Sequence, residues 1–302
     1  MPRDFRDGAL NMRVLLVLNK KAGGADEAFP DRLSKVLSQL GEVTAIQPDK
    51  DDFDPVVDGA AAGAALVVAA GGDGTVNRTV NAIRDRLDRV ELGVIPMGTG
   101  NDFARTLGIP FGDPEEAAGA IVHGVRREVD LCLARGAGVE RLFLNACIGG
   151  FPVEVDEAVS GRTKRLLGPL AYVASGAKAV TNLERSTVSI NGVTVEDCVA
   201  AGVGNGRTCG GGIAVWPDAK PDDGLLEGCA MPAANPARAV ALAARVRSGG
   251  HVGLEGVATV RAASVRIESD PPMELNVDGE ILNLTTPAEF EVVGRVSVRG
   301  SG

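Results

Sequence analysis

The sequence is poor in aromatic residues, positive charge and long apolar runs, and each shortage excludes a class of protein. The formal net charge is −9, so a broad basic surface for nucleic acid is not expected. No segment supplies about 18 consecutive apolar residues, and the N-terminal MPRDFRDGALNM lacks the apolar core of a signal peptide. With 3% aromatic residues and 40 glycines, the composition is typical of a loop-rich globular α/β protein. We expect a cytoplasmic protein that only a local basic patch would bring into transient contact with a membrane.

Cysteine and histidine form no pattern that predicts a metal site or a disulfide framework. The five cysteines are an odd number without a CxxC pair, and neither of the two histidines lies near a cysteine in the sequence. A structural zinc is therefore not expected, and a chain of this size does not depend on disulfides. We expect reduced and mostly buried thiols.

The first part of the chain alternates short apolar runs with helical patterns. Apolar runs at 13–18, 65–70 and 91–95 indicate strands, and a weaker strand pattern lies at 42–47. Helical patterns separate these runs. Because repeated strand-then-helix units place their strands side by side, they predict a parallel sheet covered on both faces.

The pattern of the sequence changes after about residue 127. Short strands with alternating apolar residues follow, separated by glycine, asparagine, aspartate and proline, with helical insertions at about 153–183 and 236–247. A chain of 302 residues is long enough for two domains. We expect an α/β domain in 1–127 and an antiparallel β domain in 128–285, with the ligand site in the cleft between them.

A glycine-rich turn follows the apolar run at 65–70 and opens a predicted helix. It consists of Gly71, Gly72, Asp73, Gly74, Thr75, Val76 and Asn77. Glycines let backbone N–H groups approach an anion closely, and a helix start adds the positive end of its dipole, so the turn has the features of a phosphate loop. A carboxylate beside phosphates indicates Mg²⁺ between them. The alternative is a tight turn in which Asp73 or Thr75 caps the helix. The turn matches neither GxxxxGK[ST] nor GxGxxG.

A second turn of this kind follows the apolar run at 91–95. The segment 96–105, PMGTGNDFAR, again joins a predicted strand to a predicted helix. Ligands of open parallel sheets bind outside the carboxyl ends of the strands, so both turns are expected at one edge. GGDGTVN followed by GTGNDFAR resembles the diacylglycerol kinase catalytic family. NAD kinases and phosphofructokinases share the GGDG-type turn, and GTGNDFAR is the part that distinguishes the lipid kinases.

The resemblance spans nearly the whole chain and implies a fold, a reaction and its ligands. The implied fold is an α/β nucleotide domain with a parallel sheet, of the NAD kinase and diacylglycerol kinase type, followed by an antiparallel β-sandwich domain. The tail at about 286–302 is expected to return to the first domain. The implied reaction transfers the γ-phosphate of ATP, with Mg²⁺, to the hydroxyl of a lipid such as diacylglycerol. The sequence identifies neither the lipid nor the oligomeric state, so a homodimer stays open.

The resemblance also assigns roles to individual residues. Nucleotide contacts fall on Asn19, on the turn 71–77 and on Thr99. Asp278 is implied to be the base that takes the proton of the lipid hydroxyl, and Glu280 to support the metal and its waters. From the residues alone, the Asp-Gly sequence that contains Asp278 is equally a hairpin turn signal.

Further acidic residues are implied to hold metal. A structural Mg²⁺ site falls on Asp223 with the backbone oxygens of Lys220 and Leu225, which suits the oxygen ligands that Mg²⁺ prefers. Asp102 and Asp130 are implied to hold the catalytic Mg²⁺ through water, and Asp73 and Asp102 join the catalytic set. Plainer explanations are an Asp-Asp-Gly turn at 222–224, a helix cap at Asp102 and an exposed strand residue at Asp130.

The chain departs from the family pattern at two positions, and other functions stay open. The family's Asn-Pro-x-x-Gly loop lacks its proline at 19–23, and a family threonine is missing at 45–48. The segment 162–183 joins a basic cluster to apolar residues, which fits either an interfacial helix or an amphipathic helix packed on the β domain. The rival functions are a kinase of a small soluble polyol or nucleotide, and a nucleotide-binding regulatory protein without catalysis.

Overall fold

The computed structural model describes residues 12–19, 28–150 and 184–300. The predicted insertion at 153–183, with its basic and apolar segment, and the loop after Asn19 lie outside the described residues. The chain divides into two compact units. Unit 1 comprises Met1–Leu131 and Gly294–Gly302, and unit 2 comprises Cys132–Val293.

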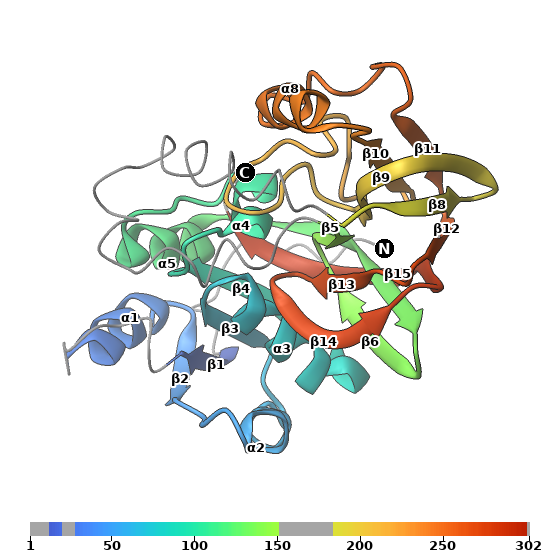
Figure 1. The fold of residues 1–302 in the computed structure, drawn as a ribbon. Coiled ribbons are helices and arrows are strands. Elements are labelled where there is room, and N and C mark those ends of the chain that lie inside the picture. The colour runs from blue at the N-terminus through green and yellow to red at the C-terminus, as the bar shows by residue number, and fades with distance from the viewer. Residues whose placement is uncertain (1–11, 20–27, 151–183, 301–302) are drawn as a thin grey trace, which may run out of the picture. The chain divides into compact units, whose positions relative to one another are not determined.

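Unit 1 is a parallel sheet with helices packed on it (Figure 1). Its elements are β1 (Met12–Leu18), α1 (Phe29–Leu37), β2 (Gly41–Ile46), α2 (Phe53–Ala60), β3 (Leu66–Gly71), α3 (Asp73–Ala82), η1 (Arg84–Arg86), β4 (Glu91–Pro96), α4 (Asp102–Leu107) and α5 (Pro114–His123). Strands β2, β1, β3 and β4 pair in that order in parallel, and the end of β15 (Ala288–Gly300) pairs in parallel with β4. The predicted parallel α/β sheet is confirmed.

Burial explains why the strands of unit 1 are visible in the sequence. All six residues of β3 are buried, as expected of a strand that is covered on both faces. Helix α1 packs against α5 and buries Phe29, Leu33 and Leu37, which share one face because they are spaced four residues apart. Asp113 precedes helix α5, and its side chain accepts the N–H of Glu115 and so caps the helix.

The register of the sheet positions the two glycine-rich turns. Gly71, the last residue of β3, is paired with Pro96, the last residue of β4. Both turns therefore begin side by side at the carboxyl edge of the sheet, where ligands of parallel sheets bind.

Unit 2 consists mainly of antiparallel strands. Its elements are the end of β5 (Val125–Gly136), β6 (Val139–Phe143), β7 (Ala146–Gly149), β8 (Ser186–Ile190), β9 (Val193–Gly204), β10 (Leu226–Pro232), α8 (Pro236–Val246), β11 (Ala258–Ala262), β12 (Ser264–Asp270), β13 (Glu274–Val277), β14 (Glu280–Thr285) and the start of β15. Strands β14, β13, β7, β9, β8, β12 and β15 pair in that order, and β10 joins β9 to β11. The predicted antiparallel β domain and its helix near 236–247 are confirmed.

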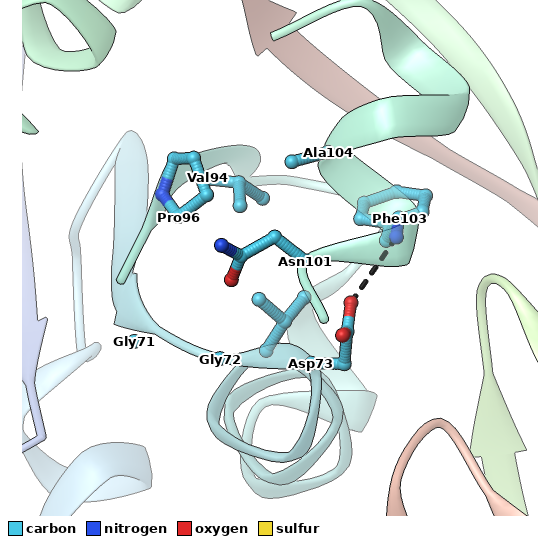
Figure 2. A pocket seen from close by; sticks show the side chains of 9 residues that line it. Gly71, Gly72, Asp73, Val94, Pro96, Asn101, Phe103 and Ala104 are labelled. Carbon is cyan, nitrogen blue, oxygen red and sulfur yellow. Dashed lines mark hydrogen bonds between the residues drawn. The ribbon is translucent and has the colours of Figure 1, made fainter. Parts of the chain in front are cut away.

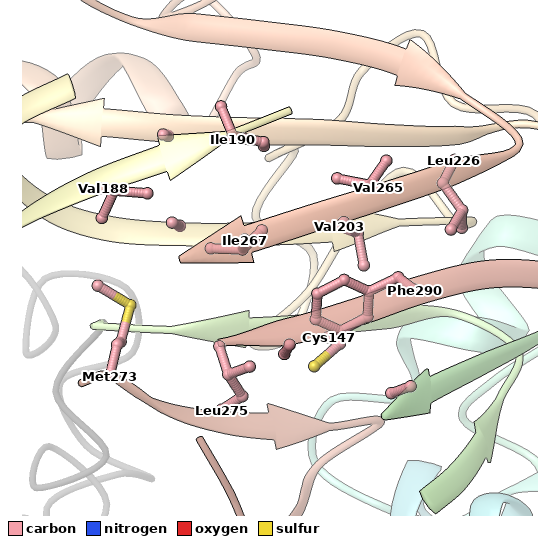
Figure 3. Close-up of a cluster of buried hydrophobic side chains, with 14 of the residues drawn as sticks. Cys147, Val188, Ile190, Val203, Leu226, Val265, Ile267, Met273, Leu275 and Phe290 are labelled. Carbon is pink, nitrogen blue, oxygen red and sulfur yellow. The ribbon is translucent and has the colours of Figure 1, made fainter. Parts of the chain in front are cut away.

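Two hydrophobic clusters fill unit 2. The larger one draws side chains such as Val188, Val265 and Leu275 from different strands (Figure 3), and Phe143 packs edge-on against Phe290 with 6.4 Å between ring centroids. The smaller one surrounds Trp216 and includes the buried side of α8. Four of the five cysteines are buried, as expected. Within the described part of the chain, no helix is both long enough and apolar enough to cross a membrane.

Candidate functional site

The turn between β3 and α3 forms the first part of the site. The N–H groups of Thr75 and Val76 both donate to the carbonyl of Gly72, at 2.9 and 3.1 Å, so the helix begins directly after the glycines. A Cβ atom on Gly71 would lie 2.4 Å from Oγ1 of Thr75, which is why a glycine is needed there. Asn19, at the end of β1, donates its side-chain amide to the same hydroxyl at 3.0 Å. The structure thus brings Asn19 and the glycine-rich turn together.

The turn between β4 and α4 is held by its own asparagine. Asn101 adopts a left-handed conformation, with φ of 52°, and its side chain both accepts the N–H and donates to the carbonyl of Gly98, each at 2.8 Å. Arg105 donates its Nε–H to the carbonyl of Gly100 at 3.0 Å. Thr99 lies exposed at the tip of this turn, where its hydroxyl is accessible to a ligand.

Asp73 joins the two turns. Its carboxylate accepts the N–H of Phe103 on Oδ1 at 3.1 Å (Figure 2). Its other oxygen, Oδ2, accepts the N–H of Asp102 at 3.1 Å, so Asp73 caps the start of α4. Gly72 and Gly98 meet at the same place, because a Cβ on Gly98 would lie only 2.5 Å from the Cα of Gly72.

The joined turns line a small recess that Figure 2 shows. Its lining residues are Gly71, Gly72, Asp73, Val76, Val94, Pro96, Asn101, Phe103 and Ala104. Of the predicted nucleotide contacts, Asn77 is 1% exposed and its side-chain oxygen accepts the amide of Asn81. Asn77 is therefore buried on α3, and its contact with the nucleotide stays a prediction.

Asp130 is fully buried, so its explanation as an exposed strand residue is wrong. It lies on β5 and accepts the Nε–H of Arg295 of β15 at 3.2 Å. A buried carboxylate requires such a partner because the loss of hydration is otherwise very costly. Arg295 is a residue that sequence reasoning missed, since no local pattern relates two positions 165 residues apart.

Asp278 lies in the hairpin turn between β13 and β14, as its Asp-Gly sequence predicts. Asp278 and Gly279 have φ of 47° and 87°, and Val277 pairs with Glu280 across the turn. The Asp278 side chain is only 8% exposed, and its carboxylate accepts the N–H groups of residues 144, 145 and 146 at 2.9, 3.1 and 2.8 Å. Three such donors stabilise the ionised carboxylate. Glu280, at the start of β14, is partly exposed.

Two asparagines that sequence reasoning missed hold the segment 144–146 in place through further hydrogen bonds. Asn205 is fully buried and donates its side-chain amide to the carbonyl of Leu144 at 2.8 Å. The side-chain amide of Asn145 donates to the carbonyl of Thr208 at 2.9 Å, and the backbone carbonyl of Asn145 accepts the N–H groups of Asn205 and Gly206. The only sequence signal was that each asparagine follows an apolar strand.

The Cys147 thiol, next to this segment, has a pKa well above its usual value. Burial is the main cause, and the negative charge of Asp278 adds to it.

The turn predicted to hold a structural Mg²⁺ contains an arginine contact. Asp223 accepts the N–H of Leu225 at 3.0 Å on one carboxylate oxygen, and Nη2 of Arg261 lies 2.5 Å from the other. Arg261 also pairs with Glu227 at 2.8 Å, and burial is the main cause that raises the pKa of Glu227. A cation at Asp223 would have to share this carboxylate with the guanidinium, which fits a magnesium site poorly. The assignment of Mg²⁺ to Lys220, Asp223 and Leu225 stays a prediction.

Comparison with known proteins decides the family. The diacylglycerol kinase catalytic domain matches residues 13–134, and the YegS C-terminal NAD kinase beta sandwich-like domain matches residues 146–297. A protein of Stenotrophomonas maltophilia named "Probable lipid kinase YegS-like" is 34% identical over 89% of this chain and 89% of its own length. The chain belongs to the diacylglycerol kinase catalytic family.

Other relatives of this family member agree. A "Diacylglycerol kinase" of Bacillus subtilis is 34% identical over 74% of both chains. A crystal structure of a diacylglycerol kinase from Bacillus anthracis superposes with a TM-score of 0.68 at 25% identity and covers 96% of this chain and 97% of that one. The fold is therefore an N-terminal diacylglycerol kinase catalytic α/β domain with parallel strands, followed by a C-terminal β-sandwich, as the sequence predicted.

Proposed function

We propose that this family member is a lipid kinase that transfers the γ-phosphate of ATP, with Mg²⁺, to the hydroxyl of diacylglycerol or a related glycerolipid. The observation that supports it best is the junction of the two glycine-rich turns, which Asp73 locks at the carboxyl edge of the parallel sheet. The names of the relatives, lipid kinase and diacylglycerol kinase, supply the acceptor class.

Nucleotide phosphates would bind at the start of α3. Gly71 and Gly72 keep side chains away from the backbone there, and the first turn of a ten-residue helix carries a partial positive charge. Asn19 and Thr75 form a polar pair beside it, and the exposed Thr99 adds a hydroxyl from the second turn. Bound Mg²⁺ would neutralise charge on the transferred phosphate. We assign its water-mediated contacts to Asp102 and Asp130, with Glu280 in support, as the family resemblance implies, and we include Asp73 because a carboxylate beside phosphates indicates Mg²⁺.

Acceptor activation is assigned to Asp278. The lipid hydroxyl oxygen forms a bond to the γ-phosphorus, the bond from that phosphorus to the β–γ bridging oxygen breaks, and the hydroxyl proton passes to the Asp278 carboxylate. Three backbone N–H donors fix the position of this carboxylate. Position matters because phosphoryl transfer has a loose transition state, in which the protein contributes mainly placement and electrostatic stabilisation.

The test is a phosphoryl-transfer assay with two acceptors. Purified protein is incubated with γ-labelled ATP, Mg²⁺ and diacylglycerol in mixed micelles, and in parallel with NAD. We expect label in the lipid phase only, and loss of turnover in Asp278→Ala with ATP affinity largely kept. Label in NAD instead of lipid would favour a soluble acceptor, and ATP binding without any transfer would favour a regulatory protein. Either result overturns the proposal.

A further inference from the structure

Helix α8 differs from the other helices in its charge. It is the one α-helix in the described part of the chain without an acidic residue, and it carries Arg238 and Arg245, with Arg247 directly at its end. Every other described α-helix has an aspartate or glutamate in its first turn. This contrast stands out in a chain of net charge −9.

The outward side of α8 is apolar between its arginines. Ala239, Leu242 and Val246 are buried against the Trp216 cluster. At 3.6 residues per turn, positions 237, 241 and 244 fall on the opposite side, and all three are exposed alanines. Positions 238 and 245, seven residues apart, lie along one border of this alanine face, and position 247 lies on the other. We call Ala237, Arg238, Ala241, Ala244, Arg245 and Arg247 the α8 surface.

The arginines of the α8 surface have no carboxylate partner within the described chain. Arg238, Arg245 and Arg247 are exposed, and none makes an ion pair with another described residue. The loop after α8 adds an exposed valine, Val252, and one exposed acid, Glu255. A second exposed acid, Asp197, lies before the start of the helix, where its backbone carbonyl accepts the N–H of Ala233. The three arginines outnumber these two acids, and distant negative charges of the molecule are screened beyond about 10 Å at 0.1 M salt.

We propose that the α8 surface docks on an anionic lipid bilayer, with α8 parallel to the membrane plane. The alanines would lie at the headgroup boundary, and the arginines on both borders would reach the lipid phosphates while their alkyl stems cover apolar surface. An acidic protein or a nucleic acid would satisfy the guanidinium groups but not the apolar face between them. The proposal rests on the proposed function, because a glycerolipid acceptor and its phosphorylated product both lie in such a bilayer.

Vesicle binding tests the surface directly. Wild-type protein is sedimented with phosphatidylcholine vesicles and with vesicles in which about one lipid in three is phosphatidylglycerol. The variant carries Arg238→Gln, Arg245→Gln and Arg247→Gln, since glutamine has a helix propensity close to that of arginine. We expect binding only to the anionic vesicles, and a loss on the order of 100-fold in the variant, from roughly a fivefold effect per basic residue.

A matched control separates position from charge. Arg89→Gln, Arg126→Gln and Arg127→Gln remove three exposed arginines from unit 1 with the same change in net charge. This control should bind the anionic vesicles like the wild type. Equal binding by the α8 variant, an equal loss in the control, or capture of the wild-type protein by heparin but not by vesicles would each overturn the proposal.

Activity with two forms of the acceptor distinguishes docking from catalysis. The α8 variant should phosphorylate water-soluble short-chain diacylglycerol at the wild-type rate, and diacylglycerol in anionic vesicles much more slowly. If the wild type binds anionic vesicles through α8 but phosphorylates no lipid, the docking surface stands and the lipid kinase function fails. If lipid is phosphorylated and the variant acts equally on both forms, docking fails and the function stands.

Discussion

The contact between the two glycine-rich turns predicts a large effect for a single methyl group. In Gly98→Ala, the new Cβ would lie 2.5 Å from the Cα of Gly72 and 3.0 Å from Oδ1 of Asn101. The nearest atom belongs to the backbone, so no side-chain rotation relieves the clash. The β4–α4 turn must move away from the β3–α3 turn, which strains the two hydrogen bonds that join Asp73 to α4.

Overpacking of this kind costs about 1–3 kcal/mol. For a domain of this size each kcal/mol lowers the melting temperature by roughly 2–4 °C. We expect Gly98→Ala to lower the thermal midpoint of unit 1 accordingly, and to weaken ATP binding in a calorimetric titration because the phosphate-binding turn is displaced.

A graded series of glycine variants makes the reasoning refutable. In Gly72→Ala the new Cβ would lie 3.2 Å from the Cα of Gly98, so the effect should be smaller than that of Gly98→Ala. In Gly119→Ala, on α5, the new Cβ meets no atom within 4 Å, so the helix should gain about 0.5–1 kcal/mol. If Gly98→Ala melts as high as the wild type, or if Gly72→Ala is the more damaging change, the close approach of the two turns is refuted.

Three further predictions follow from unit 2. Asp278→Asn keeps the shape of the side chain but turns an NH₂ group toward a backbone N–H donor. Urea denaturation should therefore show a free energy of unfolding that is lower by about 1–3 kcal/mol. Unchanged stability would contradict the role of Asp278 in holding residues 144–146. Burial lowers the pKa of His251, so protons bind the unfolded chain more tightly. The folded state should therefore lose stability as the pH falls below about 6.5, and this acid slope should flatten in His251→Phe but persist in His123→Gln. Arg261→Met should lose less than about 1 kcal/mol of unfolding free energy, because the guanidinium is half-exposed. Adding Mg²⁺ should raise the melting temperature of this variant more than that of the wild type. An equal rise would show that Arg261 does not compete with the cation for Asp223.

The fold could be predicted where burial leaves a periodic mark on the sequence. The run LVVAAG is continuous because β3 is buried on both faces, and such a run is recognisable without any knowledge of its neighbours. Strand β2 lies at the sheet edge and is only partly buried, so its pattern is weaker. The helix near 236–247 could be predicted from the sequence, but whether its outward arginines form ion pairs depends on which side chains the fold brings near them.

The site could be predicted only as far as local sequence reaches. Glycines and a carboxylate after β3 indicate a phosphate turn, but which amides Asp73 binds depends on how closely two turns approach, and that distance is set by Gly72 and Gly98 together. The Asp130 carboxylate has a partner 165 positions away, and no periodicity connects the two. Contacts of this range arise only when the fold brings distant segments of the chain together.

Asp278 shows why motif-based roles and structural roles have to be separated. The Asp-Gly sequence predicts the turn, yet the turn alone does not determine that the aspartate side chain points inward to three amides more than 130 residues upstream. The carboxylate proposed as the base therefore also holds the segment 144–146, which Asn205 fixes from the other side. A substitution at Asp278 removes both contributions at once. Loss of turnover in such a variant reports on proton transfer only if the melting temperature and ATP affinity are kept, because a released 144–146 segment would by itself misplace the acceptor site.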